Sequence, residues 1–318
     1  MRRLVSVPAL VATAPVFAVI LFSVAVWLTS RSLTSPNGYR QPDPQAFRFT
    51  ETPATQAGLA YEEVAFSVPG GQTVRGWLVP AAQGQKDIAV VALHGRGGDR
   101  RAMLRHLPML HDLGASVLLI DMRENGLSDG QGRGTGLGVR EAEDASAAAR
   151  ELRRRGYGKV VVFGCSLGGS AAIIAAAQEA SIDGVISESA IADFSTYMAD
   201  EADRHLRRLG LNARWLTDVW GRLAVDATRW RIGLSSYVIP EDVISRVAPR
   251  PILLIHALRD PWVIAAHAHS LAQRGGPNVT LWQIDGAGHC DGIDVDGPEY
   301  RSHVAALIAK VEAGPGPE

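Results

Sequence analysis

A serine between two glycines is the feature of this sequence best suited to do chemistry. The motif G-C-S-L-G occupies Gly164–Gly168, with Ser166 at its centre. It follows an apolar run at 159–163 and precedes an alanine-rich run at 169–177, so a buried strand should turn sharply into a helix there. Glycine on both sides removes side chains that would collide in so tight a turn. Such an elbow presents the serine beside a helix N-terminus and is typical of a catalytic nucleophile. The alternative is a turn of small residues that has no catalytic role.

A serine hydroxyl needs a base to take its proton, and the base needs an acid to orient it. His289 lies in a glycine-rich loop directly after the last predicted strand, and Asp260 follows the predicted strand before it. We therefore predict a triad of Ser166, Asp260 and His289. Three alternatives are open: a surface role for His289, a helix-capping role for Asp260 ahead of Pro261, and Glu188 as a substitute acid.

An acyl-transfer site also needs N–H donors for the oxyanion. The backbone N–H of Leu167, directly after the serine, is one expected donor. The second expected donor is the N–H of Arg96, in the glycine-rich loop His94–Gly98 after the first predicted parallel strand. We interpret His94 as a structural residue that braces this loop.

These residues lie far apart in the chain, and the pattern around them predicts the scaffold that unites them. Apolar runs typical of buried strands alternate with helical patterns from residue 88 onwards. This alternation indicates the α/β class, with a mostly parallel sheet and helices on both faces. The predicted strands are 88–93, 116–121, 159–163, 183–187, 251–256 and 279–284, and the predicted helices are 100–113, 139–155, 263–274 and 299–311.

Two segments depart from this alternation. Alternating runs at 61–68 and 72–79 flank Pro69-Gly70-Gly71 and predict a hairpin. Residues 193–248 contain helix-like stretches and no clear strand, and they are too long for an ordinary loop. We expect them to form a helical cap over the carboxyl edge of the sheet. Acidic residues nearly balance its arginines, which favours solvated helices, with a pocket wall or a surface that contacts lipid headgroups as the alternative.

The N-terminal stretch is apolar. Residues 4–30 carry no charged side chain, and a membrane helix needs about 20 apolar residues. Pro8 and Pro15 are tolerated in such a helix. No convincing cleavage site precedes Arg31, so we predict an uncleaved signal anchor, a transmembrane helix, in preference to a cleaved signal peptide.

The charges beside this stretch predict its orientation. Arg2 and Arg3 favour a cytoplasmic N-terminus, while Arg31 and Arg40 on the other side weaken that preference. The expected location is therefore a single-pass, membrane-anchored protein with its catalytic domain outside the cytoplasm. The predicted division is a signal anchor at 1–31, a proline-rich linker at 32–58, and a catalytic domain at 59–313 with the cap inserted at 193–248.

The composition excludes several classes of protein. With 318 residues and 47% hydrophobic content, the chain can bury a sizeable core. A net charge of −1 gives no attraction to nucleic acid, so no such partner is expected. The two cysteines, Cys165 and Cys290, adjoin the predicted nucleophile and base, a placement that suits proximity in space. We expect both to be buried free thiols, since two cysteines make no disulfide framework.

The histidine spacing and the glycine-rich segment of this sequence do not match known metal-binding or phosphate-binding motifs. His267 and His269 are two residues apart, so they would not share a helix face. The glycines at 132–138 are not followed by the lysine of a phosphate-binding loop. The sequence predicts neither a metal nor a cofactor.

Taken together, these residues resemble the α/β-hydrolase superfamily over about 61–311. The order Ser166, Asp260, His289 matches the order of nucleophile, acid and base in that superfamily. The segment 121–130, D-M-R-E-N-G-L-S-D-G, resembles its D-x-R-x-x-G-x-S loop. The resemblance implies that the aspartate and the arginine of this loop, Asp121 and Arg123, are structural braces. An N-terminal anchor, a hairpin and a cap are similar to Bem46-like membrane-anchored serine hydrolases.

The resemblance implies a serine hydrolase whose acyl group passes through Ser166. We expect it to cleave carboxylic esters or thioesters, with a small or lipid-like acyl substrate. A serine peptidase of the same fold is one alternative, and a non-catalytic binding module on a hydrolase scaffold is another. Fold does not set the substrate.

Overall fold

An eight-stranded sheet organises the domain in the computed structural model, which describes residues 7–34, 49–82 and 87–314. The strand order is β1-β2-β4-β3-β5-β6-β7-β8. The six strands from β4 to β8 in this order run parallel, whereas β1 and β2 are antiparallel to their neighbours. The strands are β1 (Glu62–Ser67), β2 (Thr73–Val79), β3 (Ile88–Leu93), β4 (Ser116–Asp121), β5 (Lys159–Cys165), β6 (Gly184–Glu188), β7 (Ile252–Ala257) and β8 (Val279–Ile284).

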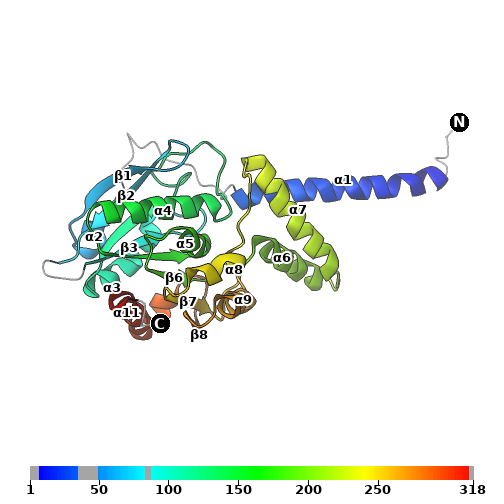
Figure 1. Cartoon of the computed structure of the whole chain (residues 1–318). Coiled ribbons are helices and arrows are strands. Elements are labelled where there is room, and N and C mark those ends of the chain that lie inside the picture. The colour runs from blue at the N-terminus through cyan, green and yellow to red at the C-terminus, as the bar shows by residue number, and fades with distance from the viewer. Residues whose placement is uncertain (1–6, 35–48, 83–86, 315–318) are drawn as a thin grey trace.

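Helices cover both faces of this sheet (Figure 1). One apolar core joins the sheet to α4, α5, η2 and α9, and a second core joins the opposite face to η1, α3 and α11. The predicted α/β architecture is therefore confirmed. The helices of these layers are η1 (Arg100–His106), α3 (Leu107–Asp112), α4 (Val139–Arg154), α5 (Leu167–Gln178), η2 (Ile244–Val247), α9 (Ala265–Gly275) and α11 (Gly297–Ala313), and a short helix, α10 (Gly292–Val295), precedes the last of them.

The central strands explain why the sheet forms. Every residue of β3, β4, β6 and β7 is buried, as expected for parallel strands with helices on both faces. The carboxyl ends of parallel strands share one edge of the sheet. The loops after β3, β5, β7 and β8, which carry the predicted site residues, therefore meet at that edge.

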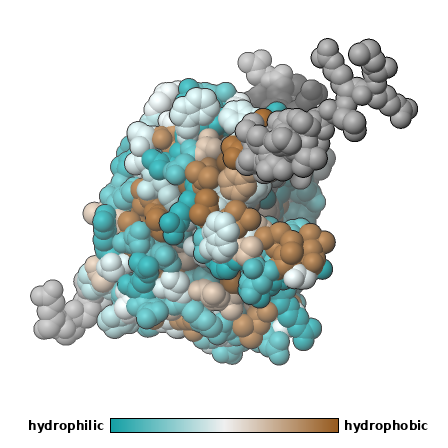
Figure 2. Space-filling view, turned by 90° about the vertical axis from the view of Figure 1, so that its right-hand side faces the viewer, coloured by the Kyte–Doolittle hydropathy of each residue, from teal (hydrophilic) through white to brown (hydrophobic). Residues whose placement is uncertain are grey.

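The segment between β6 and β7 is helical, as predicted. It contains α6 (Phe194–Arg208), α7 (Arg214–Ile232) and α8 (Pro240–Val243), and α6 and α7 lie to the right of the sheet in Figure 1. Aliphatic and aromatic side chains are exposed on these helices and on the turn between them. The face turned to the viewer in Figure 2 carries several apolar patches among polar residues. The exposed apolar residues are Leu209, Leu211, Trp215, Val219, Leu223 and Trp230.

The N-terminal helix α1 (Val7–Thr34) extends away from the sheet, and its last turns pack beside α7 (Figure 1). The side chain of Arg231 donates to the carbonyl oxygen of Ser30 at 3.1 Å, and Arg96 donates to that of Ser32 at 2.8 Å. Within the part of the chain that the structure describes, no helix combines the length and the apolar character required to cross a membrane. The predicted transmembrane helix is therefore not confirmed, and residues 1–6 lie outside the described residues.

The predicted linker at 32–58 is only partly described. Residues 35–48 lie outside the described residues, but Pro53–Ala57 forms the short helix α2, which begins with a capping box at Thr52. Phe49 packs its ring at 5.4 Å from that of Trp77. The end of the predicted linker is thus part of the packed domain, because it carries an aromatic side chain and a helix start that the proline-rich composition concealed.

Candidate active site

The elbow between β5 and α5 has the geometry expected of a nucleophile turn. Ser166 has φ 55° and ψ −117°, a conformation that costs energy for a residue with a side chain. A Cβ on Gly164 would lie 2.1 Å from the carbonyl oxygen of Gly168, and a Cβ on Gly168 would lie 2.6 Å from that of Leu93. Both glycines are therefore required by space, as the sequence indicated.

His289 and Asp260 meet beside this elbow. The imidazole Nδ1 lies 2.6 Å from Asp260 Oδ2. The other carboxylate oxygen accepts the backbone N–H groups of Trp262 and Val263, each at 2.9 Å. Asp260 therefore binds both His289 and the backbone of its own loop. It does not cap the following helix, because α9 begins at Ala265 and Ile264 occupies its N-cap position.

The charge of Asp260 is maintained by these contacts. Burial by itself would raise the pKa of this carboxyl, but hydrogen bonds from His289 and from the N–H groups of Val263 and Trp262 more than offset that effect and hold the pKa below its usual range. The side chain is fully buried, while 12% of the His289 side chain is exposed. A buried carboxylate on Nδ1 leaves Nε2 to exchange protons with a substrate.

Four of the five predicted site residues line one cavity of about 390 Å³, and the fifth, Asp260, is not part of its wall. Ser166, His289, Arg96 and Leu167 all contribute to its wall. The first helical residue of α5 and the loop after β3 thus lie beside the serine, where oxyanion donors would be needed. The rest of the wall is mostly apolar and was not identified from the sequence; it includes Leu33, Ile191, Phe194, Tyr197, Trp262 and Val263.

His94 braces the loop after β3, as interpreted from the sequence. Its Nε2 accepts the N–H of Met122 at 3.1 Å, so Nδ1 carries the proton and donates to the carbonyl oxygen of Gly95 at 2.7 Å. Burial lowers the pKa of His94 and favours its neutral form. This ring fixes the backbone next to Arg96.

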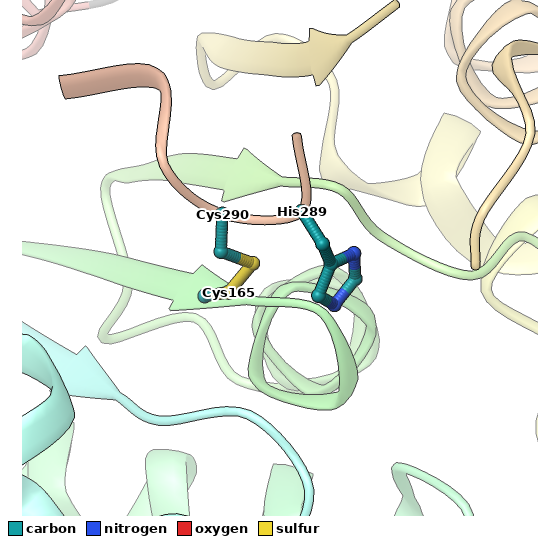
Figure 3. A group of neighbouring side chains, drawn as sticks. All are labelled: Cys165, His289 and Cys290. Atoms are coloured by element: carbon teal, nitrogen blue, oxygen red, sulfur yellow. A yellow bond between two sulfur atoms is a disulfide. The ribbon is translucent and has the colours of Figure 1, made fainter. Parts of the chain in front are cut away.

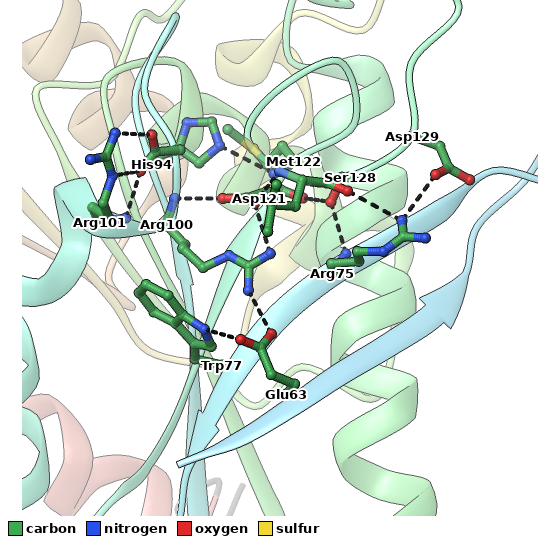
Figure 4. Close-up of polar contacts among 12 residues, drawn as sticks. Glu63, Arg75, Trp77, His94, Arg100, Arg101, Asp121, Met122, Ser128 and Asp129 are labelled. Atoms are coloured by element: carbon green, nitrogen blue, oxygen red, sulfur yellow. Dashed lines mark hydrogen bonds and ion pairs between the residues drawn. The ribbon is translucent and has the colours of Figure 1, made fainter. Parts of the chain in front are cut away.

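The two expected braces lie at the end of β4 and directly after it, and Figure 4 shows the contacts of the first, Asp121. The carboxylate of Asp121 accepts the N–H groups of Arg100 and Leu127 and pairs with the buried guanidinium of Arg100 at 2.8 Å. Arg123 binds the buried Asp144 through its backbone N–H and its side chain, at 2.8 and 2.7 Å. Neither Asp121 nor Arg123 lines the cavity.

Glu188 does not serve as the acid for His289. Its Oε1 accepts the N–H of Gly292 at 3.1 Å, and its Oε2 accepts the hydroxyl of Tyr300 at 2.8 Å. Its backbone oxygen accepts the N–H of Ser166 at 2.8 Å. Glu188 thus connects the elbow to the loop that follows His289, a supporting role that its sequence position did not reveal.

The two cysteines form a disulfide, so the expectation of free thiols was wrong. Cys165 and Cys290 have their Cα atoms 6.1 Å apart. The sequence signal was present, because each cysteine is adjacent to a predicted catalytic residue. Strand β5 and the loop after β8 meet closely enough for the two thiols to join, a distance that the sequence does not report.

In the described part of the chain, one group of side chains lies close enough together to be considered as metal ligands. It consists of Cys165, His289 and Cys290. Both sulfurs are bonded to each other, and a metal site of this kind requires thiolates. His267 accepts the N–H of Ala192 at Nδ1, and its Nε2 lies 3.5 Å from Asp200. It is a buried packing residue in contact with the cap.

With this fold and site in place, the comparisons define the class of protein. A family model described as the alpha/beta hydrolase family matches residues 90–297, so the chain belongs to that family. The uncharacterised protein YfhR of Escherichia coli O157:H7 is 28% identical over 259 residues, which span 78% of this chain and 80% of YfhR.

Solved structures show the same fold. The Pyrococcus furiosus esterase Pf2001 superposes with a TM-score of 0.66 and 22% identity, over 88% of this chain and 100% of that one. The esterase domain of a Rhodothermus marinus protein gives a TM-score of 0.54 and 20% identity, over 78% of this chain and 99% of that one. At these identities the likeness establishes the fold alone.

Proposed function

We propose that this protein is a serine hydrolase of carboxylic esters or thioesters that acts through an acyl-enzyme on Ser166. The observation that carries the proposal is the 2.6 Å bond between Asp260 and His289 at the rim of a cavity that Ser166 shares. Membership of the alpha/beta hydrolase family supports hydrolysis as the reaction class.

In the first half-reaction, His289 Nε2 takes the proton from Ser166 Oγ as the oxygen attacks the acyl carbonyl carbon. The tetrahedral intermediate collapses, and the leaving alkoxide or thiolate takes that proton from His289. In the second half-reaction, a water gives its proton to His289 and attacks the acyl-serine. The acid is released, and Ser166 recovers its proton.

Charge develops on the carbonyl oxygen in both steps. The backbone N–H groups of Leu167 and Arg96 are the proposed donors, because both residues line the cavity beside Ser166. His94 holds the backbone of the loop that carries Arg96. Fixed donors stabilise the transition state without reorganisation during the reaction.

The cavity favours an apolar acyl group over a peptide. A peptidase that binds a chain end needs a charge to receive it, and no carboxylate lies among the described lining residues. The guanidinium of Arg96 donates one N–H to the carbonyl oxygen of Ser32 at 2.8 Å, which ties it to the end of α1. The Asp260–His289 pair beside a cavity that Ser166 lines also argues against a non-catalytic binding module.

We further propose that the domain works outside the cytoplasm. The Cys165–Cys290 disulfide supports this location, because disulfides persist in oxidising compartments and are rare in the cytosol. Anchoring by the N-terminal segment stays a prediction of the sequence.

A fluorophosphonate probe tests the proposal, because it reacts only with an activated serine. We expect the wild type to be labelled and to hydrolyse p-nitrophenyl esters, and Ser166→Ala to do neither. Ser302→Ala, on an exposed position of α11, is the matched control and should behave as the wild type.

Two results would contradict the proposal. Folded wild type that takes up no probe would favour a binding module. Hydrolysis of aminoacyl-anilides without hydrolysis of esters would favour the peptidase. Comparison of oxygen esters with thioesters of one acyl chain then separates the two proposed substrate classes.

A further inference from the structure

The disulfide lies between the two halves of the proposed catalytic machinery. Cys165 is the last residue of β5 and precedes Ser166, and Cys290 follows His289, 125 residues further along the chain. Figure 3 shows the bridge joining the strand end to the loop, with the imidazole of His289 beside the helix that follows the strand. The backbones of the nucleophile and of the base are therefore linked covalently through two side chains.

The loop after β8 has further attachments. At the site itself, His289 binds Asp260 at 2.6 Å, and Arg105 donates to the carbonyl oxygen of Cys290 at 3.2 Å. Before His289, the N–H of Arg259 donates to the carbonyl oxygen of Ala287 at 3.0 Å. After it, the N–H of Gly292 donates to Glu188 at 3.1 Å. The disulfide acts between these two points and ties the loop directly to the strand that carries the serine.

The backbone at both ends of this link is in a costly conformation. Ser166 has φ 55° and Cys290 has φ 58°, in the left-handed region that residues with a side chain seldom adopt. Such conformations persist only where the surroundings determine them strongly. The disulfide at Cys290 is one covalent part of those surroundings, and it lies one residue from the imidazole of His289.

Acyl transfer is sensitive to this placement. The base must lie within hydrogen-bond reach of the serine hydroxyl, and a displacement of about 1 Å can lower the rate about 100-fold. The apolar cavity wall that would hold the acyl group comes largely from other segments, including α6 and the end of α1.

We propose that the Cys165–Cys290 disulfide is a positioning element that holds His289 against Ser166, so that reduction slows acyl transfer while substrate binding is largely retained. This inference rests on the proposed function. Cys165 and Cys290 act through the residues beside them and take no part in the chemistry.

Reduction is a balanced exchange with a dithiol such as dithiothreitol. One thiolate of the reagent attacks a sulfur of the bridge, and its second thiol then displaces the mixed disulfide. The protein gains two electrons and two protons as two thiols, and the reagent is oxidised to its cyclic disulfide. Alkylation of the two protein thiols makes the reduced state permanent.

The test compares ester hydrolysis by the full chain in the oxidised and the reduced state, and by Cys290→Ser. Active sites are first counted with the fluorophosphonate probe, so that unfolded molecules do not enter kcat. We expect kcat per active site to fall about 10- to 100-fold on reduction, the size that a small misplacement produces, with KM changed less than about threefold. Reoxidation of unalkylated protein should restore kcat, and Cys165→Ala/Cys290→Ala should not respond to the dithiol.

Three results would overturn the inference. An unchanged kcat in the reduced protein would show that the base is held without the bridge. A rise in KM at constant kcat would assign the bridge to substrate binding. If the reduced protein lost both its near-ultraviolet circular dichroism and all active sites that the probe can label, the bridge would instead serve the stability of the whole fold. Oxidised wild type that neither hydrolyses esters nor takes up the probe would instead refute the proposed function.

Discussion

Asp260 performs two tasks with its two oxygens. One oxygen binds Nδ1 of His289, and the other accepts two backbone N–H groups of its own loop. An asparagine retains one oxygen for the loop but offers His289 an amide in place of a carboxylate. The proposed catalytic role and the structural role of Asp260 are therefore separable by one substitution.

Asp260→Asn should lower kcat about 10⁴-fold, the size of effect expected when the base is held in the wrong tautomer. The melting temperature should change little, because the amide oxygen still accepts the N–H groups of Trp262 and Val263. Steady-state ester hydrolysis and thermal unfolding of the same preparation measure the two effects. Asp285→Asn is the control, since 84% of that side chain is exposed. A variant that retains wild-type kcat would remove Asp260 from the mechanism.

Gly168 is required by space at the elbow. A Cβ at this position would lie 2.6 Å from two carbonyl oxygens, those of Leu93 and His94. We expect Gly168→Ala to destabilise the protein by about 1–3 kcal/mol through overpacking, and to lower the rate of probe labelling because the elbow must shift. Denaturant unfolding measures the first effect. Gly297→Ala, where a Cβ meets nothing within 4 Å, should be neutral; equal stability of both variants would contradict this account of the turn.

At the scale of elements, β6 holds together the elbow and the loop that carries His289. Glu188, its last residue, accepts the N–H of Ser166 through its backbone and the N–H of Gly292 through its side chain. Burial by itself would raise the pKa of this carboxyl, but contacts with His106, Tyr300 and Gly292 more than offset it and hold the pKa below its ordinary value.

Because the folded pKa of Glu188 lies below the value of about 4.3 for a free glutamate, its ionised form contributes stability above about pH 4.3. That contribution is lost as the pH falls through the lower folded value. Glu188→Gln should therefore cost about 1–3 kcal/mol at neutral pH, and the difference from wild type should shrink in acid. Unfolding free energies measured across this range test the prediction, with the half-exposed Glu51→Gln as control. A difference that grows in acid would carry the wrong sign.

Helix α1 contributes to the cavity as well as extending away from the sheet. Leu33, in its last turn, is 5% exposed and lines the cavity. The turn is held by Arg96 at Ser32 and by the hydroxyl of Thr135, which donates to the carbonyl oxygen of Leu33 at 3.0 Å. The end of α1 is thus a candidate determinant of acyl selectivity.

Leu33→Ala should raise KM for long-chain p-nitrophenyl esters about tenfold, the equivalent of 1.4 kcal/mol of lost apolar contact. Acetate esters, whose acyl group is too short to reach this wall, should be hydrolysed as by the wild type. A series of acyl lengths measures the difference. Leu28→Ala, on an exposed position of the same helix, is the control. An equal effect on short and long esters would show that Leu33 stabilises the fold and does not select the acyl chain.

At the scale of the molecule, the sheet could be predicted because buried parallel strands have an unmistakable pattern. Each predicted strand from 88 onwards appears within two residues of its expected bounds. The predicted helix 100–113 instead splits into η1 and α3. Pro108, in the first turn of α3, lacks the N–H that a continuous helix would need there.

The meeting of the candidate residues Ser166, Asp260 and His289 could be predicted from the sequence, since each follows a predicted strand and parallel strands end at one edge. The disulfide and the cavity wall could not be predicted in the same way. They depend on distances between loops and on helix α1, which joins the cavity from a remote part of the chain. Periodicity reports which face of an element is buried and does not report which distant element covers it.

The oxidation state of the whole chain in the cell tests the proposed location outside the cytoplasm. We expect the expressed protein to carry no free thiol, so that a maleimide polymer adds to it only after denaturation and reduction, with two additions. A variant that lacks residues 1–34, made in the same cells, should remain in the reducing cytosol and take up two labels without reduction, since glutathione and thioredoxin keep cytosolic thiols reduced. Cys165→Ala/Cys290→Ala takes up none in either case and controls for unspecific labelling. Two free thiols in the full-length protein would place it in the cytoplasm and would leave His289 without its covalent link to the nucleophile strand in the cell.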